Sequence, residues 1–252
     1  MSHVAPLSQL LIRWVTGQTI PSRCEFCGTW PTHPSGHPWC KRCGDQWGQP
    51  VKRCLQCAIR LDAPGRVCGQ CLTTRPALTS CCAAVDYGFP WSDIVLKLKR
   101  EHGSAWAKPM AGLMWPAIQE HFGVNLPDVW APIPLHTHKL KIRGHNQAWE
   151  LTRALARCAV KAGAPNPRLA PHLLRRIHEG HAQHHLHHAQ RWANVRDSFE
   201  LDTMPDQPKS VLLIDDVFTT GATLRAATER LNQQGLTQIH GAVFARTPRH
   251  HA

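Results

Sequence analysis

The sequence contains no long hydrophobic run. Its longest apolar stretches have the length of a single strand, and the N-terminal stretch from Leu7 to Val15 is interrupted by Gln9 and Arg13. A membrane-spanning helix needs about 20 apolar residues, and a secretory signal peptide needs a continuous apolar segment. We therefore expect a cytoplasmic protein with no transmembrane segment, for which peripheral association with a membrane surface stays open.

Acidic residues are also scarce. The 252 residues include 17 Asp and Glu against 29 Lys and Arg, which gives a formal net charge of +12. This surplus of positive charge indicates an acidic partner such as a nucleic acid or a polyphosphate. The basic residues are dispersed along the chain, so charge that serves only solubility is an equal alternative.

Cysteine, by contrast, is abundant. Without an export signal, eleven cysteines indicate metal binding in a reducing compartment rather than disulfides. Eight of them form four Cys-x-x-Cys pairs, separated by twelve, ten and ten residues. The two-residue spacing lets both sulfurs of a pair bind one tetrahedral ion. The predicted zinc ligands are Cys24, Cys27, Cys40, Cys43, Cys54, Cys57, Cys68 and Cys71.

The pairing of these four knuckles stays open. Consecutive knuckles could share an ion, the sequence does not exclude an interleaved arrangement, and a single filled site is a third alternative. Many prolines and few apolar residues surround the knuckles, so we expect a module at 21–75 that metal rather than a core holds together. Two zinc ions with four thiolates each would lower the net charge to about +8. Cys81, Cys82 and Cys158 lie in apolar surroundings and are predicted to be buried rather than ligands.

A second pattern occupies residues 211–223. Four apolar residues, Val211 to Ile214, precede Asp215 and Asp216, and a loop of Thr219, Thr220, Gly221, Ala222 and Thr223 follows before a stretch with helical spacing. This order predicts a buried parallel strand, a loop and a helix. Hydroxyl donors, a glycine and the free N–H groups of a first helical turn together form a site for a monophosphate.

The two acids of this motif cannot bind the same phosphate, because they would repel it. Carboxylates at a strand end suit the hydroxyls of a ribose or a magnesium ion, so the pattern indicates a phosphorylated ribose. An acidic turn between an ordinary strand and helix is the alternative, and it leaves the composition of the loop unexplained.

The rest of the chain predicts an α/β domain. Helices are expected at 1–20, 91–99, 108–122 and 148–162, and strands at 81–85, 129–135 and 239–245. A basic loop with Lys139, Lys141 and Arg143 leads to Asn146, the expected N-cap of the helix at 148–162. This loop could hold a second anion, although a short basic loop is often only a solvated turn.

A tract rich in histidine runs from His178 to His188. Its spacing does not repeat like a ligand set, so we expect a mobile polar arm over a phosphorylated ligand rather than a metal site. The last residues, 247–252, are expected to form a basic tail.

Taken together, the motifs resemble the ComF family. The resemblance rests on the cysteine knuckles, on Arg143-Gly144-x-Asn146-Gln147 after a Pro-x-Pro strand, on the 215–223 loop, and on Gln183, Arg191, Asn194, Val195 and Phe199 between them. His145 departs from the aromatic residue that the family has there. The resemblance implies a double zinc ribbon (21–75) followed by a type I phosphoribosyltransferase-like domain (80–246), whose parallel sheet is flanked by helices.

The resemblance also implies a ligand, phosphoribosyl pyrophosphate (PRPP) with magnesium. Thr219 to Thr223 would bind its 5′-phosphate, Asp215 and Asp216 its ribose hydroxyls, and Arg143 its pyrophosphate. It further implies a role in natural transformation, with single-stranded DNA and other competence proteins, such as helicases or DNA-processing factors, as partners. Whether a phosphoribosyl group is transferred stays open, since no acceptor or base can be named. The alternatives are a non-enzymatic nucleic-acid-binding or scaffold protein that PRPP regulates, and a protein whose zinc ribbons alone are functional.

Overall fold

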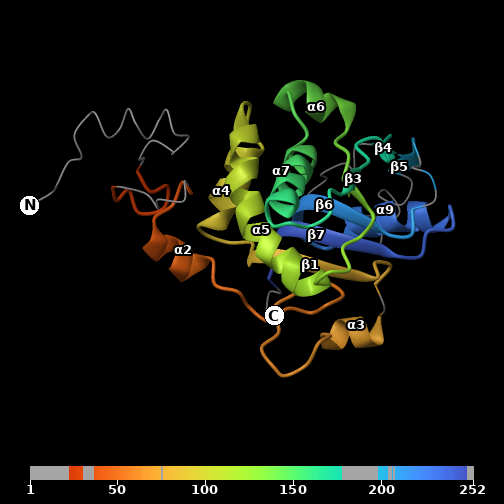
Figure 1. Cartoon of the computed structure of the whole chain (residues 1–252), viewed down its shortest axis with the longest axis horizontal. Coiled ribbons are helices and arrows are strands. Elements are labelled where there is room, and N and C mark those ends of the chain that lie inside the picture. The colour runs from red at the N-terminus through yellow and green to blue at the C-terminus, as the bar shows by residue number, and fades with distance from the viewer. Residues whose placement is uncertain are drawn as a thin grey trace, which may run out of the picture. The chain divides into compact units, whose positions relative to one another are not determined.

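The computed structural model describes residues 23–30, 37–74, 76–177, 198–203, 206 and 208–248 (Figure 1). The expected helix at 1–20, the histidine tract and the end of the basic tail lie outside the described residues. The chain divides into two compact units, residues 1–49 and 50–252. The first two cysteine knuckles therefore belong to the smaller unit, whereas the third and fourth share the larger unit with the α/β sheet.

The smaller unit contains one described helix, α2 (Lys41–Trp47), directly after Cys40. Its largest buried side chain is Trp39, which stacks on Phe26 with 5.7 Å between the ring centroids. Apart from this aromatic contact and the cysteines, few described apolar side chains of the unit are buried. Among its described residues, a metal held by the first two knuckles would therefore supply most of the stability.

A five-stranded parallel sheet forms the centre of the larger unit (Figure 1). Its strands are β1 (Ser80–Asp86), β2 (Val129–Pro132), β3 (Arg168–Leu169), β6 (Val211–Phe218) and β7 (Ile239–Arg246). They follow the order β1-β7-β6-β2-β3, and every neighbouring pair is parallel. All carboxyl ends consequently lie at one edge of the sheet, where ligands of open α/β sheets bind.

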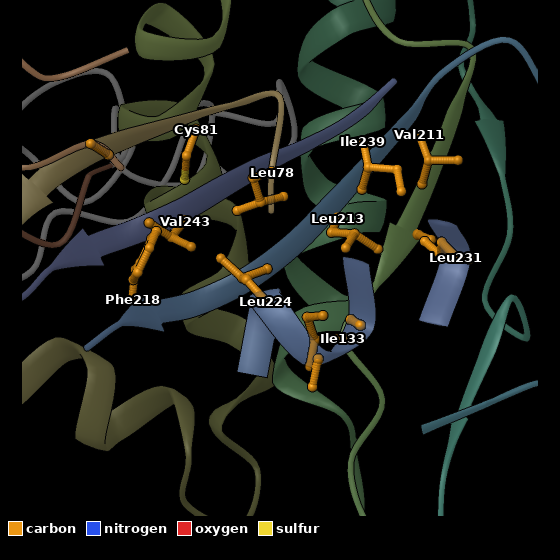
Figure 2. Packing of buried hydrophobic residues seen from close by; sticks show 14 of the residues in the cluster. Leu78, Cys81, Ile133, Val211, Leu213, Phe218, Leu224, Leu231, Ile239 and Val243 are labelled. Atoms are coloured by element: carbon orange, nitrogen blue, oxygen red, sulfur yellow. The ribbon is translucent and has the colours of Figure 1, made fainter. Parts of the chain in front are cut away.

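Helices cover both faces of this sheet. The longer ones are α4 (Trp91–Leu98), α5 (Ala107–Phe122), α7 (Gln147–Lys161) and α9 (Ala222–Asn232), and the short ones are α3 (Gly69–Thr73), η1 (Gly103–Trp106) and α6 (Thr137–Arg143). Helices α5 and α7 pack on each other and on the sheet. Leu224 and Leu231 of α9 share a core with Leu213 and Val243 of the sheet (Figure 2). The predicted fold class, a phosphoribosyltransferase-like parallel sheet flanked by helices, is confirmed.

Burial on both faces explains the sequence of β6. Val211, Leu212, Leu213 and Ile214 are all fully buried, because successive side chains of a strand point to opposite faces and each face is covered. A continuous apolar run is therefore the expected pattern for this strand, and β6 lies between β7 and β2 in the sheet.

A second, two-stranded sheet joins β4 (Leu174–Arg176) to β5 (Phe199–Leu201) in antiparallel register. Arg176 pairs with Phe199 in this register, and its guanidinium lies 5.5 Å from the centre of the Phe199 ring. Beyond the register, the amide of Ile177 donates a hydrogen bond to the carbonyl of Ser198 (2.9 Å).

One predicted element is wrong. Residues 139–147 were expected to form a basic loop, whereas Thr137–Arg143 form the helix α6. The side chain of His136 accepts a hydrogen bond from the His138 amide at the start of α6, and Gly144 ends it with a φ of +73°. Lys, Leu and Arg are good helix formers, and a helix of one or two turns with no buried residue leaves no apolar periodicity to detect.

Other boundaries differ by a few residues. The strand expected at 129–135 ends at Pro132, where the prolines at 132 and 134 offer no N–H for a sheet. The expected N-cap is confirmed, since the Asn146 side chain accepts hydrogen bonds from the amides of Ala148 (2.9 Å) and Trp149 (3.5 Å). This cap fixes the direction in which α7 leaves the carboxyl edge of the sheet.

Candidate functional site

A cleft of about 290 Å³ opens at the carboxyl edge of the sheet. Segments that are distant in the sequence line it, including the ends of β1 and β6, the residue after α4 and the turn from α6 to α7. Its polar and charged lining residues are Tyr87, Lys99, Lys139, Arg143, Gln147, Arg176, Asp215, Asp216, Thr219 and Thr223.

The cleft unites most of the residues that the sequence singled out. Arg143 and Lys139 face it together with the acids and with Thr219 and Thr223, whereas Thr220, Gly221 and Ala222 complete the loop between those two threonines. Sequence reasoning did not identify Lys99 as a site residue. Its only signal was a position at the end of an amphipathic helix, where a lysine is common in any helix.

The acids lie deep in the cleft. Asp215 and Asp216 are 8% and 4% exposed, and the amide of Asp216 donates a hydrogen bond to Asp215 Oδ1 (2.9 Å). Burial, followed by the negative charge of Asp216, raises the pKa of Asp215 well above its usual range. Keeping two buried carboxyl groups next to each other near the carboxyl end of β6 therefore lowers the free energy of unfolding of the ligand-free protein.

Lys99 partly compensates this charge. Its Nζ lies 2.8 Å from Asp216 Oδ2 in an ion pair that bridges α4 and β6. Within the described part of the chain, the ammonium of Lys99 thus offsets the charge of a buried carboxylate oxygen. A ligand hydroxyl or a divalent cation would also fit an oxygen of this kind.

The loop 219–223 lies beside the acids. Gly221 has a φ of +83°, and a Cβ there would overlap the Phe218 ring, lying 2.8 Å from Cζ. Only glycine therefore allows this turn. Helix α9 begins directly after it, so the amides of its first turn point toward the loop, as expected for an anion site.

Cationic side chains occupy the other side of the cleft. Arg143 Nη1 donates a hydrogen bond to Gln147 Oε1 (3.0 Å), which holds the guanidinium at the start of α7. Lys139 lies one helical turn earlier on α6, and Arg176 comes from β4. Besides the acids and Lys99, the cleft thus contains three further cations, an arrangement that suits a ligand with hydroxyls near one end and anionic groups elsewhere.

Two groups of four cysteines lie outside the cleft. The sulfurs of Cys24, Cys27, Cys40 and Cys43 are within 4.8 Å of one another, and so are those of Cys54, Cys57, Cys68 and Cys71. Consecutive knuckles therefore share a cluster, which resolves the pairing that the sequence left open. Cys81, Cys82 and Cys158 are outside both groups.

The geometry of both clusters fits zinc. Four sulfurs at about 2.3 Å from a tetrahedral ion are about 3.8 Å apart. Cys27 Sγ lies 3.7 Å from Cys40 Sγ, and Cys57 Sγ lies 3.7 Å from Cys68 Sγ. The amides of Cys40 and Cys68 also donate to a sulfur of the preceding knuckle, each at 3.3 Å, which stabilises thiolate charge. Both clusters could bind zinc.

The thiols of the second cluster, which consists of Cys54, Cys57, Cys68 and Cys71, compete for protons. A hydrogen bond with Cys57 lowers the pKa of Cys54 to about 4, and the same contact raises the pKa of Cys57 above its usual range. One thiolate in such a group forms easily, while its neighbours resist ionisation. A divalent cation removes this conflict because it stabilises all four thiolates together.

Residues 196–251 match the phosphoribosyl transferase domain family. Most of the chain aligns with curated proteins: it is 28% identical over 235 residues to the DNA utilization protein YhgH of Salmonella typhimurium, covering 91% of this chain and 99% of that protein. It is 26% identical to competence protein F of Haemophilus influenzae, covering 86% and 93% of the two chains. The chain is homologous to these DNA utilization and competence proteins. The resemblance to the ComF family is thereby confirmed.

The chain is also 26% identical over 237 residues to the DNA utilization protein YhgH of Escherichia coli K12, covering 91% of this chain and 99% of that protein. The phosphoribosyl transferase match contains β6, the loop 219–223, α9 and β7, the elements that form the acid and loop side of the cleft. Among the described residues, no helix has the length and apolarity to cross a membrane.

The cysteine geometry predicts two zinc ions per chain. Metal analysis of protein purified without chelator should give about two equivalents, and Cys68→Ser should give about one, because three ligands bind zinc much more weakly. Cys158→Ser, which changes a cysteine of α7 outside both clusters, is the control and should retain two. Much less than one equivalent in the unmodified protein would contradict the assignment.

The burial of Asp215 predicts that Asp215→Asn stabilises the ligand-free protein at pH 7. The pKa of Asp215 is raised in the folded state, so folding stability is lost as the pH rises above about 4, where the unfolded carboxyl ionises. Asparagine carries no charge and avoids this loss. Urea denaturation between pH 4 and 8 measures the difference, which should grow with pH.

The control for this measurement is Asp62→Asn, which changes an exposed acid and should alter stability by less than about 0.5 kcal/mol. The prediction is contradicted if Asp215→Asn is less stable than the unmodified protein at pH 7, or if the difference in their free energies of unfolding does not depend on pH. Either result would show that the buried acid pair does not destabilise the fold.

Proposed function

We propose that the cleft binds PRPP with magnesium. The loop from Thr219 to Thr223 would bind the 5′-phosphate, Asp215 and Asp216 the ribose hydroxyls, and Arg143 the pyrophosphate, with Lys139 beside it. The observation that supports this assignment most strongly is the buried pair Asp215 and Asp216, which lines the same cleft as Thr219 and Thr223 of the loop. Their carboxylates would accept hydrogen bonds from ligand hydroxyls, whereas they would repel a simple phosphate.

Magnesium fits the same acids, since carboxylate oxygens are its preferred protein ligands and it is commonly bound together with substrate phosphates. When bound, it would supply positive charge to the pyrophosphate. The protein's own contribution would be to position PRPP between the loop and α6 and to exclude water from it.

We further propose that the protein handles single-stranded DNA in the cytoplasm together with other competence proteins. The names of its homologues refer to DNA utilization and competence, and its net charge of +12 suits a polyanion. If PRPP is also a substrate, an acceptor would displace pyrophosphate at the anomeric carbon. Cations that stabilise the leaving pyrophosphate would then provide most of the catalysis.

A non-enzymatic role for PRPP is the second candidate. Among the described residues that line the cleft, none is a histidine or a glutamate that could act as a base for an acceptor, and both aspartates are assigned to the ribose. This observation favours a ligand that regulates DNA binding rather than one that is consumed.

The proposal predicts that the acids are essential for PRPP binding. Calorimetry with magnesium should show that replacing both Asp215 and Asp216 by Asn weakens binding more than about a hundredfold, because charged hydrogen bonds to the ribose are lost. Asp62→Asn should bind like the unmodified protein. Unchanged affinity of the double variant would remove the basis of the site assignment.

Pyrophosphate release separates the two candidates. The zinc-loaded protein is incubated with PRPP, magnesium and either a panel of bases or single-stranded DNA. Release with any acceptor supports transfer, whereas binding without release supports the regulatory role.

Binding to single-stranded DNA should depend steeply on salt. Fluorescence anisotropy of a labelled oligonucleotide should give a plot of log affinity against log salt with a slope of about −0.7 for each phosphate that the protein neutralises. A slope near zero would exclude the electrostatic contact that the charge implies.

A further inference from the structure

Arg246, the last residue of β7, lies between the second cysteine cluster and the loop 219–223. In the sheet it pairs with Asp86 at the end of β1 on one side and with Phe218 at the end of β6 on the other. Its position at the carboxyl edge therefore places a cation beside the loop, although Arg246 itself does not line the cleft.

The guanidinium of Arg246 connects the second cysteine cluster to the loop 219–223 through backbone carbonyls. Its Nε donates to the carbonyl of Cys57 (2.9 Å), and its Nη1 contacts the carbonyls of Phe218 (2.9 Å), Thr219 (2.6 Å) and Thr247 (2.9 Å). Because Nη1 carries two hydrogens, these three acceptors share them. One planar group thus fixes the carbonyl of Cys57, a predicted zinc ligand, relative to the first residues of the loop.

The aromatic ring of Phe218 extends this connection. The guanidinium carbon lies 4.3 Å from the centre of the ring, a cation–π contact. Gly221 lies so close to the same ring that a Cβ at this position would overlap it. Phe218 and Val243, both labelled in Figure 2, belong to the core that also contains the second cluster. A shift of Arg246 would therefore move the ring on which the turn at Gly221 rests.

The position of the Cys57 carbonyl depends on the metal site. Cys57 belongs to the knuckle 54–57, and the next residue, Ala58, has a φ of +57°, which is unfavourable for alanine. Hydrogen bonds of Cys54 with Ala58 and Ile59 (2.8 Å each) close this turn. A metal bound by both sulfurs of the knuckle would hold the turn against its strain, and metal loss would release it.

We propose that Arg246 is a positioning residue through which metal binding at the second cluster orders the loop 219–223. Its effect on ligand affinity rests on the proposed function, because the loop is assigned to the 5′-phosphate. Its effect on the loop itself does not, since that can be measured without any ligand.

Arg246→Lys tests the connection. Lysine keeps the charge, but its single ammonium cannot span Cys57 and the loop carbonyls together. In the ligand-free, zinc-loaded protein, amide exchange in residues 218–225, including the Arg225 amide that donates to Gly221, should become about tenfold faster. Zinc content should stay at that of the unmodified protein, and the amides of 211–214 serve as an internal reference for global stability.

Arg168→Lys is the matched control. Arg168 also donates to a backbone carbonyl, that of Asp206 (3.3 Å), but from the edge strand β3. Its replacement should leave exchange in 218–225 unchanged. Phe218→Leu provides a second variant that keeps an apolar residue and removes only the ring, and it should accelerate exchange of the loop as well.

The decisive comparison removes the metal by chelation. In the unmodified protein, chelation should accelerate exchange in 218–225, whereas in Arg246→Lys it should add little, because the connection is already broken. Equal acceleration in both proteins, or exchange in Arg246→Lys as slow as in the unmodified protein, would overturn the proposal. PRPP affinity is measured separately: if the unmodified protein does not bind PRPP, the proposed function fails while the exchange result still decides the role of Arg246.

Discussion

The burial of two adjacent carboxyl groups at the end of β6 is the constraint around which the larger unit is arranged. A strand that is paired on both sides and covered on both faces must be apolar, so its polar groups can occur only near the carboxyl edge, where neighbouring strands end. Asp215 and Asp216 follow Ile214, the last residue of β6 that pairs with β2, whereas β6 stays paired with β7 as far as Phe218. Lys99 contributes a positive charge from α4, and the loop that follows reverses the chain into α9. The cleft exists because these segments converge on the same edge.

The sequence was sufficient for the parts of the structure that depend on local pattern. The apolar run of β6, the Asn146 cap and the four cysteine knuckles each carry their own chemistry within a few residues, and the structure contains all three. Helix α6 was missed because its stability comes from residue propensity and its end caps rather than from a buried face.

Contacts between distant segments could not be predicted in the same way. Lys99 lies more than a hundred residues before Asp216, and nothing in its neighbourhood distinguishes it from any lysine at a helix end. The pairing of the knuckles likewise required three-dimensional proximity, because the spacing allowed more than one arrangement. The roles proposed for Arg143 and the loop residues stay predictions, supported by their meeting in one cleft.

The division of the chain between Gln49 and Pro50 has a practical meaning for protein production. The sequence alone would place the start of a truncated protein after residue 75, just behind the last knuckle. Such a truncation would remove Cys54, Ala58 and Ile59, which are buried in the same core as Leu78 and Val243. It would leave an apolar surface exposed to water and invite aggregation. A recombinant fragment that begins at Pro50 keeps this core whole. The segment that carries the third and fourth knuckles therefore belongs to the same compact unit as the sheet.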